Sequence, residues 1–574
     1  MSNRNLLFLP FLAVLCFVMA LAPAQPAAAA NIVVNNVDAP GIGFNDPTPA
    51  TPLGGNPGTT LGDQRLIAFQ FAADLWGATL DSNVDIVVQA TFQPLGCTPT
   101  SGTLGSAGTI QIFTNFPGAI LPNHWYHSAL ANKLAGFDLT PGPPDPGLLV
   151  PPFNDDIVAF FNGAINNDPN CIGGANWYYG LDNNPGANEI DFLNVLMHEL
   201  AHGLGFANFI NETDGTGPLG LPDVYTAFTR DNTLGINWNV MTDAQRAFSA
   251  ANTGEVVWDG PIVTAQAPNF LGNRPVMTIN SPGSIAGTYQ IQTAAFGAQL
   301  TTAGLTGNVV LADDGSGVVT DACEPLVNGA QVAGNIALVD RGACAFTLKA
   351  LNAQAAGAVA VLIANNVAGG PAPMGGFDAN VTITSVGLTL DDGNTIKGEL
   401  PGVNVTLGLD PNLLAGADDN GLVRLYAPSV VALGSSISHW DTVATPNLLM
   451  EPFISADLAT ATTTDLTPYL LADEGWMLLD SDGDGLPNIE DACPSSDLGS
   501  TVVIDGCDSG VTNTLLADGC SITDLILACA DGAGNHGAFV SCAAQVGNDL
   551  KRAGVISGRD KGQIQSCAAS SSLP

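Results

Sequence analysis

One short stretch of the chain, His198-Glu199-Leu200-Ala201-His202, combines residue types that bind a metal ion and move a proton. On a helix, positions i and i+4 lie on one face, so the two imidazoles can bind one metal ion. The Glu199 carboxylate can then accept a proton from a water bound beside them. These groups are the minimal set for zinc-dependent peptide hydrolysis. Because the chain has only six histidines, a chance match is rare, although two surface histidines on an ordinary helix remain the alternative.

A catalytic zinc usually has three protein ligands and one open position for water, so a third ligand must come from outside this stretch. Four other histidines remain in the chain. His124 and His127 precede the motif, His439 lies far beyond it, and His536 lies in the C-terminal part. We favour His439, because its segment follows the long insertion described below and completes the same lobe. His124 and Tyr126 are weaker candidates for positions near the cleft.

Three separate stretches together resemble the leishmanolysin-type metzincins: residues 198–206, residues 438–440 and residues 449–450. Most metzincins carry the third histidine in the pattern HExxHxxGxxH. Here Gly205 is in place, but Asn208 stands at the last position. In the leishmanolysin pattern the third histidine follows an insertion and precedes the methionine of the Met-turn. This chain has the same arrangement with an unusually long insertion.

The resemblance implies a role for each matching residue. His198, His202 and His439 would bind one catalytic zinc ion, and Glu199 would be the general base. Met450, 11 residues after His439, would be the Met-turn residue beneath the metal. The implied activity is that of a zinc metalloendopeptidase acting on proteins or peptides.

The elements that must position these residues can be predicted from hydrophobic periodicity. Helical spacing of apolar residues predicts helices over residues 62–76, 189–203 and 467–476. Residues 84–92 alternate as a strand does, and residues 157–161 form a second short strand candidate. Helices and strands in this order predict an α+β fold with a zinc protease lobe.

Between the two parts of this lobe lies a segment rich in Gly, Ala and Val. Short apolar runs begin at Val309, Ile336 and Ala358, and residues 345–356 between the last two predict a helix. The stretch from Cys323 to Asn366, with Val339-Asp340-Arg341-Gly342-Ala343-Cys344-Ala345-Phe346, resembles a protease-associated (PA) domain. The resemblance implies a non-catalytic β-rich α/β insert that binds substrates or partners.

The run from Asp480 to Asp491 is dense in oxygen ligands, which hard Ca²⁺ ions prefer, and its glycines allow the chain to wrap. It is similar to a thrombospondin type 3 calcium repeat, and an acidic flexible linker is the alternative. The predicted calcium ligands are Asp480, Asp482, Asp484, Asn488 and Asp491.

The predicted domain organisation has six parts. They are a signal peptide (1–30), a first part of the metallopeptidase domain (31–275), a PA domain (276–408), a second part of the metallopeptidase domain (409–479), a calcium repeat (480–510) and a Cys-containing helical module (511–574). The first part of the metallopeptidase domain begins with an extended lead-in that runs to about residue 60.

The first thirty residues have the pattern of a cleaved signal peptide, with Arg4 before an apolar run and an Ala-rich exit. No later segment is apolar over the length of a membrane span. We therefore expect an exported protein without a stable span after cleavage. Its low Lys content and signal peptide fit a bacterial source, although composition does not fix the organism. Of the 11 cysteines, ten remain after cleavage, an even number that fits disulfides. Pairing within local groups would join Cys97 to Cys171, Cys323 to Cys344 and Cys493 to Cys507, with the last four left open.

The net charge of −39 disfavours a nucleic-acid partner, because phosphates would be repelled.

Serine or cysteine hydrolysis is a weaker alternative function, since no GxSxG is present and the even cysteine count leaves no obvious nucleophile. The main alternative is a binding or adhesion protein that retains an inactive protease fold beside PA and calcium modules. Glu199 argues against that alternative, because such a protein has no physical need for this carboxylate between two histidines.

Overall fold

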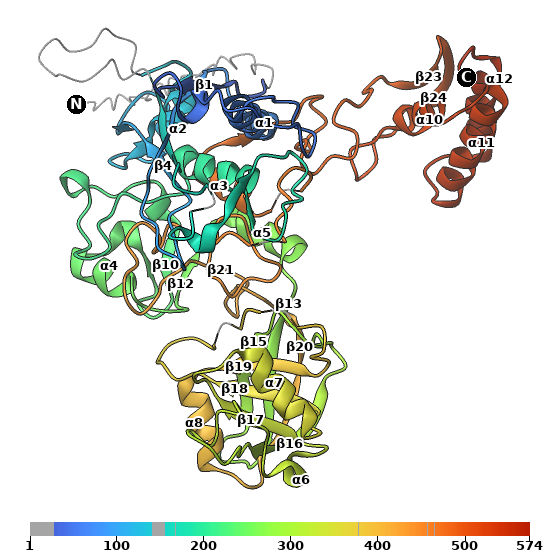
Figure 1. Cartoon of the computed structure of the whole chain (residues 1–574). Helices are drawn as coiled ribbons and strands as arrows, with labels where there is room; N and C mark the ends of the chain where they lie inside the picture. Colours follow the sequence, from blue (N-terminus) through green and yellow to red (C-terminus); the bar gives the residue numbers. More distant parts are fainter. Residues whose placement is uncertain are drawn as a thin grey trace, which may run out of the picture.

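The computed structural model describes residues 28–139 and 155–574, apart from residues 167, 373, 377, 456 and 464. Figure 1 shows three bodies: a large lobe, a lower domain and a small C-terminal module. The large lobe is built from the first half of the chain and from the segment that returns to it after the lower domain, residues 415–479, which we call the returning segment. Most of the predicted signal peptide lies outside the described residues. Its last residues, Ala28 to Ala30, pack on the large lobe, where the Ala30 amide donates to the carbonyls of Gly77 and Leu80.

The first sheet of the large lobe has the strand order β1-β3-β7-β4. Its strands are β1 (Ile32–Asn36), β3 (Ile86–Gln93), β7 (Ile157–Asn162) and β4 (Gly105–Thr109). β1, β3 and β7 are parallel, and β4 runs antiparallel at the edge. Alternate residues of β3 are buried, which is the pattern that its sequence predicted. β1 lies within the stretch expected to be an extended lead-in.

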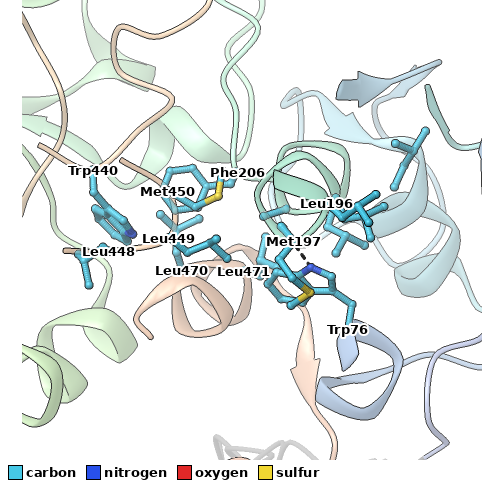
Figure 2. Packing of buried hydrophobic residues seen from close by; sticks show 14 of the residues in the cluster. Trp76, Leu196, Met197, Phe206, Trp440, Leu448, Leu449, Met450, Leu470 and Leu471 are labelled. Carbon is cyan, nitrogen blue, oxygen red and sulfur yellow. Dashed lines mark hydrogen bonds between the residues drawn. The ribbon is translucent and has the colours of Figure 1, made fainter. Parts of the chain in front are cut away.

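Two long helices lie on this sheet and fix its inner face. α1 (Leu61–Thr79) begins where the Thr60 side chain accepts from the Asp63 amide. α3 (Phe192–Leu204) is buried along its whole length. The helix predicted from residue 189 begins three residues later, because β9 (Glu189–Asp191) pairs with β8 (Asn176–Tyr178) and Asp191 caps α3. Figure 2 shows Trp76 of α1 packed on Met197 of α3, to whose carbonyl its indole donates.

The second half of the large lobe is built from segments on both sides of the lower domain. A small sheet has the order β11-β10-β12-β21, with β10 (Thr229–Asp231), β11 (Ile236–Asn237), β12 (Val256–Trp258) and the returning strand β21 (Val423–Arg424). α9 (Thr467–Glu474) packs against α5 (Pro261–Phe270), and its Asp473 accepts from the amides of Ile262 and Val263 at the start of α5. The smaller elements of this lobe are α2 (Ser128–Ala135), α4 (Asp243–Ser249), β2 (Leu80–Asp81), β22 (Met477–Leu478), β5 (Ile112–Phe113) and β6 (Tyr126–His127).

The lower domain is one sheet with the order β14-β13-β20-β16-β17-β18-β19-β15. β16 (Leu305–Leu311), β17 (Ile336–Asp340), β18 (Ala360–Ala364) and β19 (Thr384–Leu388) are parallel. The other strands are β13 (Asn273–Ser281), β14 (Gly287–Gln290), β15 (Gln292–Thr293) and β20 (Asn404–Leu414), with helices α6 (Gly329–Val332), α7 (Phe346–Ala355) and α8 (Leu390–Gly398). Separate apolar clusters form on the two faces of the sheet, so its central strands are buried on both sides.

The C-terminal module contains a hairpin, β23 (Thr501–Ile504) and β24 (Cys507–Thr512), and three helices, α10 (Ile522–Asp531), α11 (His536–Arg552) and α12 (Gly558–Ser570). The expected bond between Cys493 and Cys507 is wrong. Cys493 bonds to Cys520, and Cys507 bonds to Cys567, because α12 packs on β24 and brings its cysteine to the start of that strand. Cys529 bonds to Cys542.

In the large lobe Cys97 bonds to Cys171, and in the lower domain Cys323 bonds to Cys344. Five disulfides in the described residues are typical of proteins that fold in an oxidising compartment.

Within residues 28–139 and 155–574, no helix combines the length and apolar character that a membrane span requires.

Candidate metal centre

Helix α3 places His198 and His202 one turn apart on the same face. Their Nε2 atoms lie 3.1 Å from each other. Both side chains are buried, because α3 packs on the first sheet on one side and contacts the returning segment at Leu449 and Trp476 on the other.

The helix ends at Leu204, two residues after His202, and its C-cap Gly205 adopts a φ of 154°. This positive φ favours glycine, and the Phe206 carbonyl that follows it lies 2.7 Å from the His202 Nδ1 atom.

His439 comes to the same point from a segment 241 residues away, and its Nε2 lies 3.2 Å from that of His198. The segment is held by backbone hydrogen bonds on both sides of the histidine. The Tyr426 amide donates to the His439 carbonyl, and the Trp440 amide donates to the Met450 carbonyl. The position of the third histidine is therefore determined by β21 and its extension on one side and by the turn at Met450 on the other.

Each of the three rings has its Nδ1 against a backbone carbonyl. The partners are the carbonyls of Leu449 for His198 at 2.8 Å, Phe206 for His202 at 2.7 Å and Ser435 for His439 at 2.8 Å. Because a carbonyl only accepts, each Nδ1 must carry the proton, and each Nε2 of a neutral ring then presents a lone pair. Histidines that bind metals are oriented in this way by their outer nitrogen.

The electrostatics of the three rings favour the neutral form. Burial lowers the pKa of His198 to about 4 and the pKa of His202 to about 3. Burial also lowers the pKa of His439 well below its ordinary value. Three converging lone pairs cannot hydrogen-bond to one another, so the arrangement fits a cation. Tetrahedral Zn–N bonds of 2.0–2.1 Å would separate neighbouring nitrogens by about 3.3 Å, close to the two observed distances.

Glu199 lies beside this cluster under the edge strand β4. Its side chain is buried, and burial raises its pKa to about 8, while the backbone amide of Ala107 in β4 lowers it. A Cβ atom on Gly105 of the same strand would lie 2.8 Å from the Glu199 Oε1 atom. Glycine at this position therefore makes room for the carboxyl. A divalent cation at the three histidines would favour the ionised form of Glu199.

Met450 is fully buried next to the histidine cluster. Figure 2 shows it beside Phe206 and Leu449, close to Trp440. The turn that contains Met450 also supplies the Leu449 carbonyl that orients His198. The turn therefore contacts both the first histidine and the segment of the third.

Asn208, which stands where most metzincins have the third histidine, does not join the cluster. Its side-chain amide donates to Ser438 Oγ at 3.1 Å, and its backbone amide donates to the same atom at 3.2 Å. Asn208 thus holds the residue that precedes His439. This role was missed from the sequence, because nothing in the spacing of the two residues connects them.

The remaining histidines do not join the cluster, although His127 is near enough for its charge to lower the pKa of His202. His124 is partly exposed, and its Nδ1 donates to the Pro122 carbonyl. His127 is buried against Phe209, with ring centroids 4.5 Å apart. Tyr126 is buried with its hydroxyl at the Leu121 backbone. His536 belongs to the C-terminal module, where its Nδ1 donates to the Leu573 carbonyl.

The acidic run forms a second cluster, in which the carboxylates of Asp480, Asp482 and Asp484 lie within 4.8 Å of one another. Within the part of the chain that the structure describes, one oxygen of Asp484 and one of Asp491 are buried without a hydrogen-bond partner. Burial and the three neighbouring carboxylates raise the pKa of Asp491. The side chain of Asn488 is hydrogen-bonded to Ser481 instead. Its oxygen accepts from the Ser481 backbone amide, and its amide donates to the Ser481 hydroxyl.

A third acidic group, in the lower domain, was not found from the sequence. It consists of Asp314, Asp321 and Glu324. Unlike the other clusters it already contains a positive charge, since the buried Lys349 ammonium donates to the Asp321 carbonyl and lies 4.0 Å from its carboxylate.

Comparison with known proteins identifies the lower domain. Residues 305–396 match the PA domain family, so the chain contains a PA domain. Similar curated proteins include Vacuolar-sorting receptor 1 of Pisum sativum (31% identical over 106 residues, 18% of this chain and 17% of the receptor). Signal peptide peptidase-like 2 of Arabidopsis thaliana is 54% identical over 46 residues, 8% of each chain. The chain thus spans less than a fifth of either relative.

Solved structures with a local likeness include a zinc aminopeptidase from Bacillus subtilis, 25% identical over 26% of this chain and 36% of that chain, with a TM-score of 0.19. An aminopeptidase from Aneurinibacillus sp. strain AM-1 is 17% identical over 33% of this chain and 42% of that chain, with a TM-score of 0.17. Both neighbours are peptidases by name, and scores this low describe a likeness of a part only.

Proposed function

We propose that this protein is an exported zinc-dependent endopeptidase similar to the leishmanolysin-type metzincins, with His198, His202 and His439 as zinc ligands. The observation that carries the proposal is the convergence of three neutral Nε2 atoms with all three Nδ1 atoms bound to carbonyls. Two of the ligands come from one helix and the third from beyond the PA domain. A zinc ion bound here supplies an electrophile for the scissile carbonyl and lowers the pKa of a water molecule.

Glu199 is the proton-transfer group of the proposed reaction. Its carboxylate accepts the proton of the attacking water and later delivers that proton to the leaving amine. Burial of the Glu199 side chain against β4 fixes its position. A backbone amide of β4 donates to the carboxyl, which limits its rotation.

The edge strand β4 is the element that would bind the peptide. It pairs with β7 on one side only, and an edge strand offers backbone donors and acceptors to an extended chain. A substrate strand added there would pass the Glu199 carboxyl at Gly105. Backbone pairing of this kind supports cleavage within a protein chain rather than recognition of one side chain.

The other modules have supporting roles in this proposal. The PA domain would bind substrate or partner proteins. The acidic run at Asp480, Asp482, Asp484 and Asp491 would bind Ca²⁺ as a structural ion, supported by its unpartnered buried oxygens. Export through residues 1–30 agrees with the five disulfides, and the bacterial origin stays a prediction.

The test is the substitution Glu199→Gln in the mature protein, with Asp74→Asn, an exposed residue of α1, as control. We expect kcat on a denatured protein substrate to fall by about 10²–10⁴-fold with one zinc retained per chain. Asp74→Asn should leave both unchanged. A zinc-loaded wild type that cleaves no protein substrate would favour the inactive binding protein instead.

A further inference from the structure

Residues 28–30, which we call the N-terminal segment, were predicted to leave with the signal peptide, yet they are built into the large lobe. The Ala30 side chain is only 6% exposed and belongs to the apolar core of the lobe. Ala29 forms an antiparallel bridge with Asp81 of β2. Asp81 also pairs with Met477 of β22, so the N-terminal segment is a third chain beside this short pair of strands.

The N-terminal segment completes the C-terminal end of helix α1. The last carbonyls of a helix have no partner within the helix. Here the Ala30 amide lies 3.1 Å from the Gly77 carbonyl and 2.9 Å from the Leu80 carbonyl, and it donates to both. A Cβ atom on Gly77 would lie only 2.5 Å from the Ala30 carbonyl oxygen. Glycine at position 77 therefore makes room for the N-terminal segment.

Two further hydrogen bonds hold the first residue of the segment. The Ala28 amide donates to the Asp81 carboxylate at 2.7 Å, and the Ser82 amide donates to the Ala28 carbonyl at 2.9 Å. Asp81 is 8% exposed. Its charge also acts on Lys133, whose pKa burial lowers and Asp81 raises. Removal of the segment would take a partner from the buried Ser82 amide and from Asp81, and a buried polar group that loses its partner destabilises the fold.

The end of α1 lies one contact away from the helix of the proposed metal centre. The Trp76 indole of α1 donates to the Met197 carbonyl of α3 at 3.2 Å (Figure 2). Met197 directly precedes His198 in the chain. A mature protein without the N-terminal segment would therefore have a less well-ordered α1 beside the first histidine.

The sequence offers four places for cleavage by a signal peptidase, because the small-residue pattern Ala-x-Ala occurs four times. The patterns end at Ala22, Ala24, Ala29 and Ala30. Cleavage after Ala29 or Ala30 would divide or remove the N-terminal segment. Cleavage after Ala22 would break a bond to the ring nitrogen of Pro23, which carries no N–H for a protease to bind. The pattern that ends at Ala24 follows the apolar run directly and leaves the segment whole.

We propose that the leader is cleaved after Ala24, so that the exported protein begins at Gln25 and keeps the N-terminal segment as part of its fold. A signal peptidase of the exporting cell hydrolyses the bond between the Ala24 carbonyl carbon and the Gln25 nitrogen. Water supplies the second oxygen of the Ala24 carboxylate and the protons of the new Gln25 amino group. The mature chain is then six residues longer than one that begins at Asn31. The proposal does not depend on peptidase activity of this protein.

The first experiment identifies the amino terminus of the exported protein. The full chain with its own leader is exported by a bacterial host as the Glu199→Gln variant, so that the protein cannot trim itself. Mass spectrometry of the intact protein and of its first peptide then gives the first residue. We expect Gln25, as glutamine or in its cyclised form. A protein that begins at Asn31 or at any other residue, or that keeps the leader, would overturn the proposal.

The second experiment tests the structural role of the N-terminal segment. Two chains that begin at Gln25 and at Asn31 are exported behind the same foreign leader, and the melting of the large lobe is compared. We expect the Tm of the shorter chain to be lower by about 2–4 °C or more. Equal Tm values would overturn the claim that the segment is part of the fold.

A substitution at Asp81 separates the contact at Ala28 from a general effect of chain length. Asp81→Asn should lower the Tm of the chain that begins at Gln25 more than that of the chain that begins at Asn31, because the shorter chain has already lost the Ala28 amide. Asp74→Asn, an exposed residue of α1, is the control and should act equally in both chains. Equal effects of Asp81→Asn in the two chains would overturn the assigned contact.

Discussion

The three-histidine site and the acidic run are both clusters of metal-ligand side chains, yet the fold builds them in opposite ways. His198, His202 and His439 are buried, and their outer nitrogens are all held by backbone carbonyls. Asp480, Asp482 and Asp484 are only half-buried and come from five consecutive residues. The first site is assembled by tertiary structure from segments far apart in the chain, whereas the second depends on local turns. We therefore expect the metals to differ in what their removal does.

The largest expected difference is in proteolytic activity, which removal of zinc should abolish and removal of calcium should largely leave. 1,10-Phenanthroline, which binds zinc, should reduce cleavage of a protein substrate by about 10³-fold or more, because the electrophile is lost. EGTA, which prefers calcium, should leave most of the activity, because the acidic run lies in a separate segment. Readdition of Zn²⁺ should restore the rate. Equal inhibition by the two chelators would break the comparison.

A smaller effect is expected on the stability of the C-terminal part. Ca²⁺ at 100 times its Kd would stabilise its site by about 2.7 kcal/mol, and Asp482→Asn should remove most of that gain. Hydrogen exchange of residues 480–510 should then become faster without Ca²⁺, while α3 keeps its protection. Asp531→Asn, an exposed acid in α10, is the control. Loss of protection in α3 to the same extent would show that the two sites are not independent.

The smallest effect concerns pH and the turn beside the histidines. Burial raises the pKa of Glu451 from 4.5 to about 8. The unfolded chain therefore releases this proton first, and the free energy of unfolding falls as the pH rises from about 4.5 to about 8. Glu451→Gln removes this dependence, so its Tm should exceed that of the wild type at pH 8 and nearly equal it at pH 5. A gain of the same size at both pH values would show that the carboxyl is not the cause.

The sequence predicted what depends on local spacing. The α3 motif, the strand β3 and the PA segment each follow from periodicity or from a continuous pattern. The choice of His439 rested on its place after the insertion and on the family resemblance, since no local rule connects it to His198. The structure now brings the two together, while their role as ligands stays a proposal.

The parts that were missed depend on packing between distant segments. Cys507 bonds to Cys567 because α12 lies on β24, and α12 is too polar for its helical period to stand out. Its capping box at Ser557 and Asp560 was the available signal. The role of Asn208, which holds Ser438, is equally invisible before the chain is folded.

The most direct test of the account is the metal content of the mature protein, measured by elemental analysis in the wild type and in His439→Ala, with His124→Ala as control. The account predicts one zinc per chain in the wild type and in His124→Ala. It predicts zinc binding weakened by more than about 100-fold in His439→Ala, because the third lone pair is lost. Full zinc retention in His439→Ala would contradict a site assembled across the PA domain, and the absence of zinc from the wild type would contradict the proposed function itself.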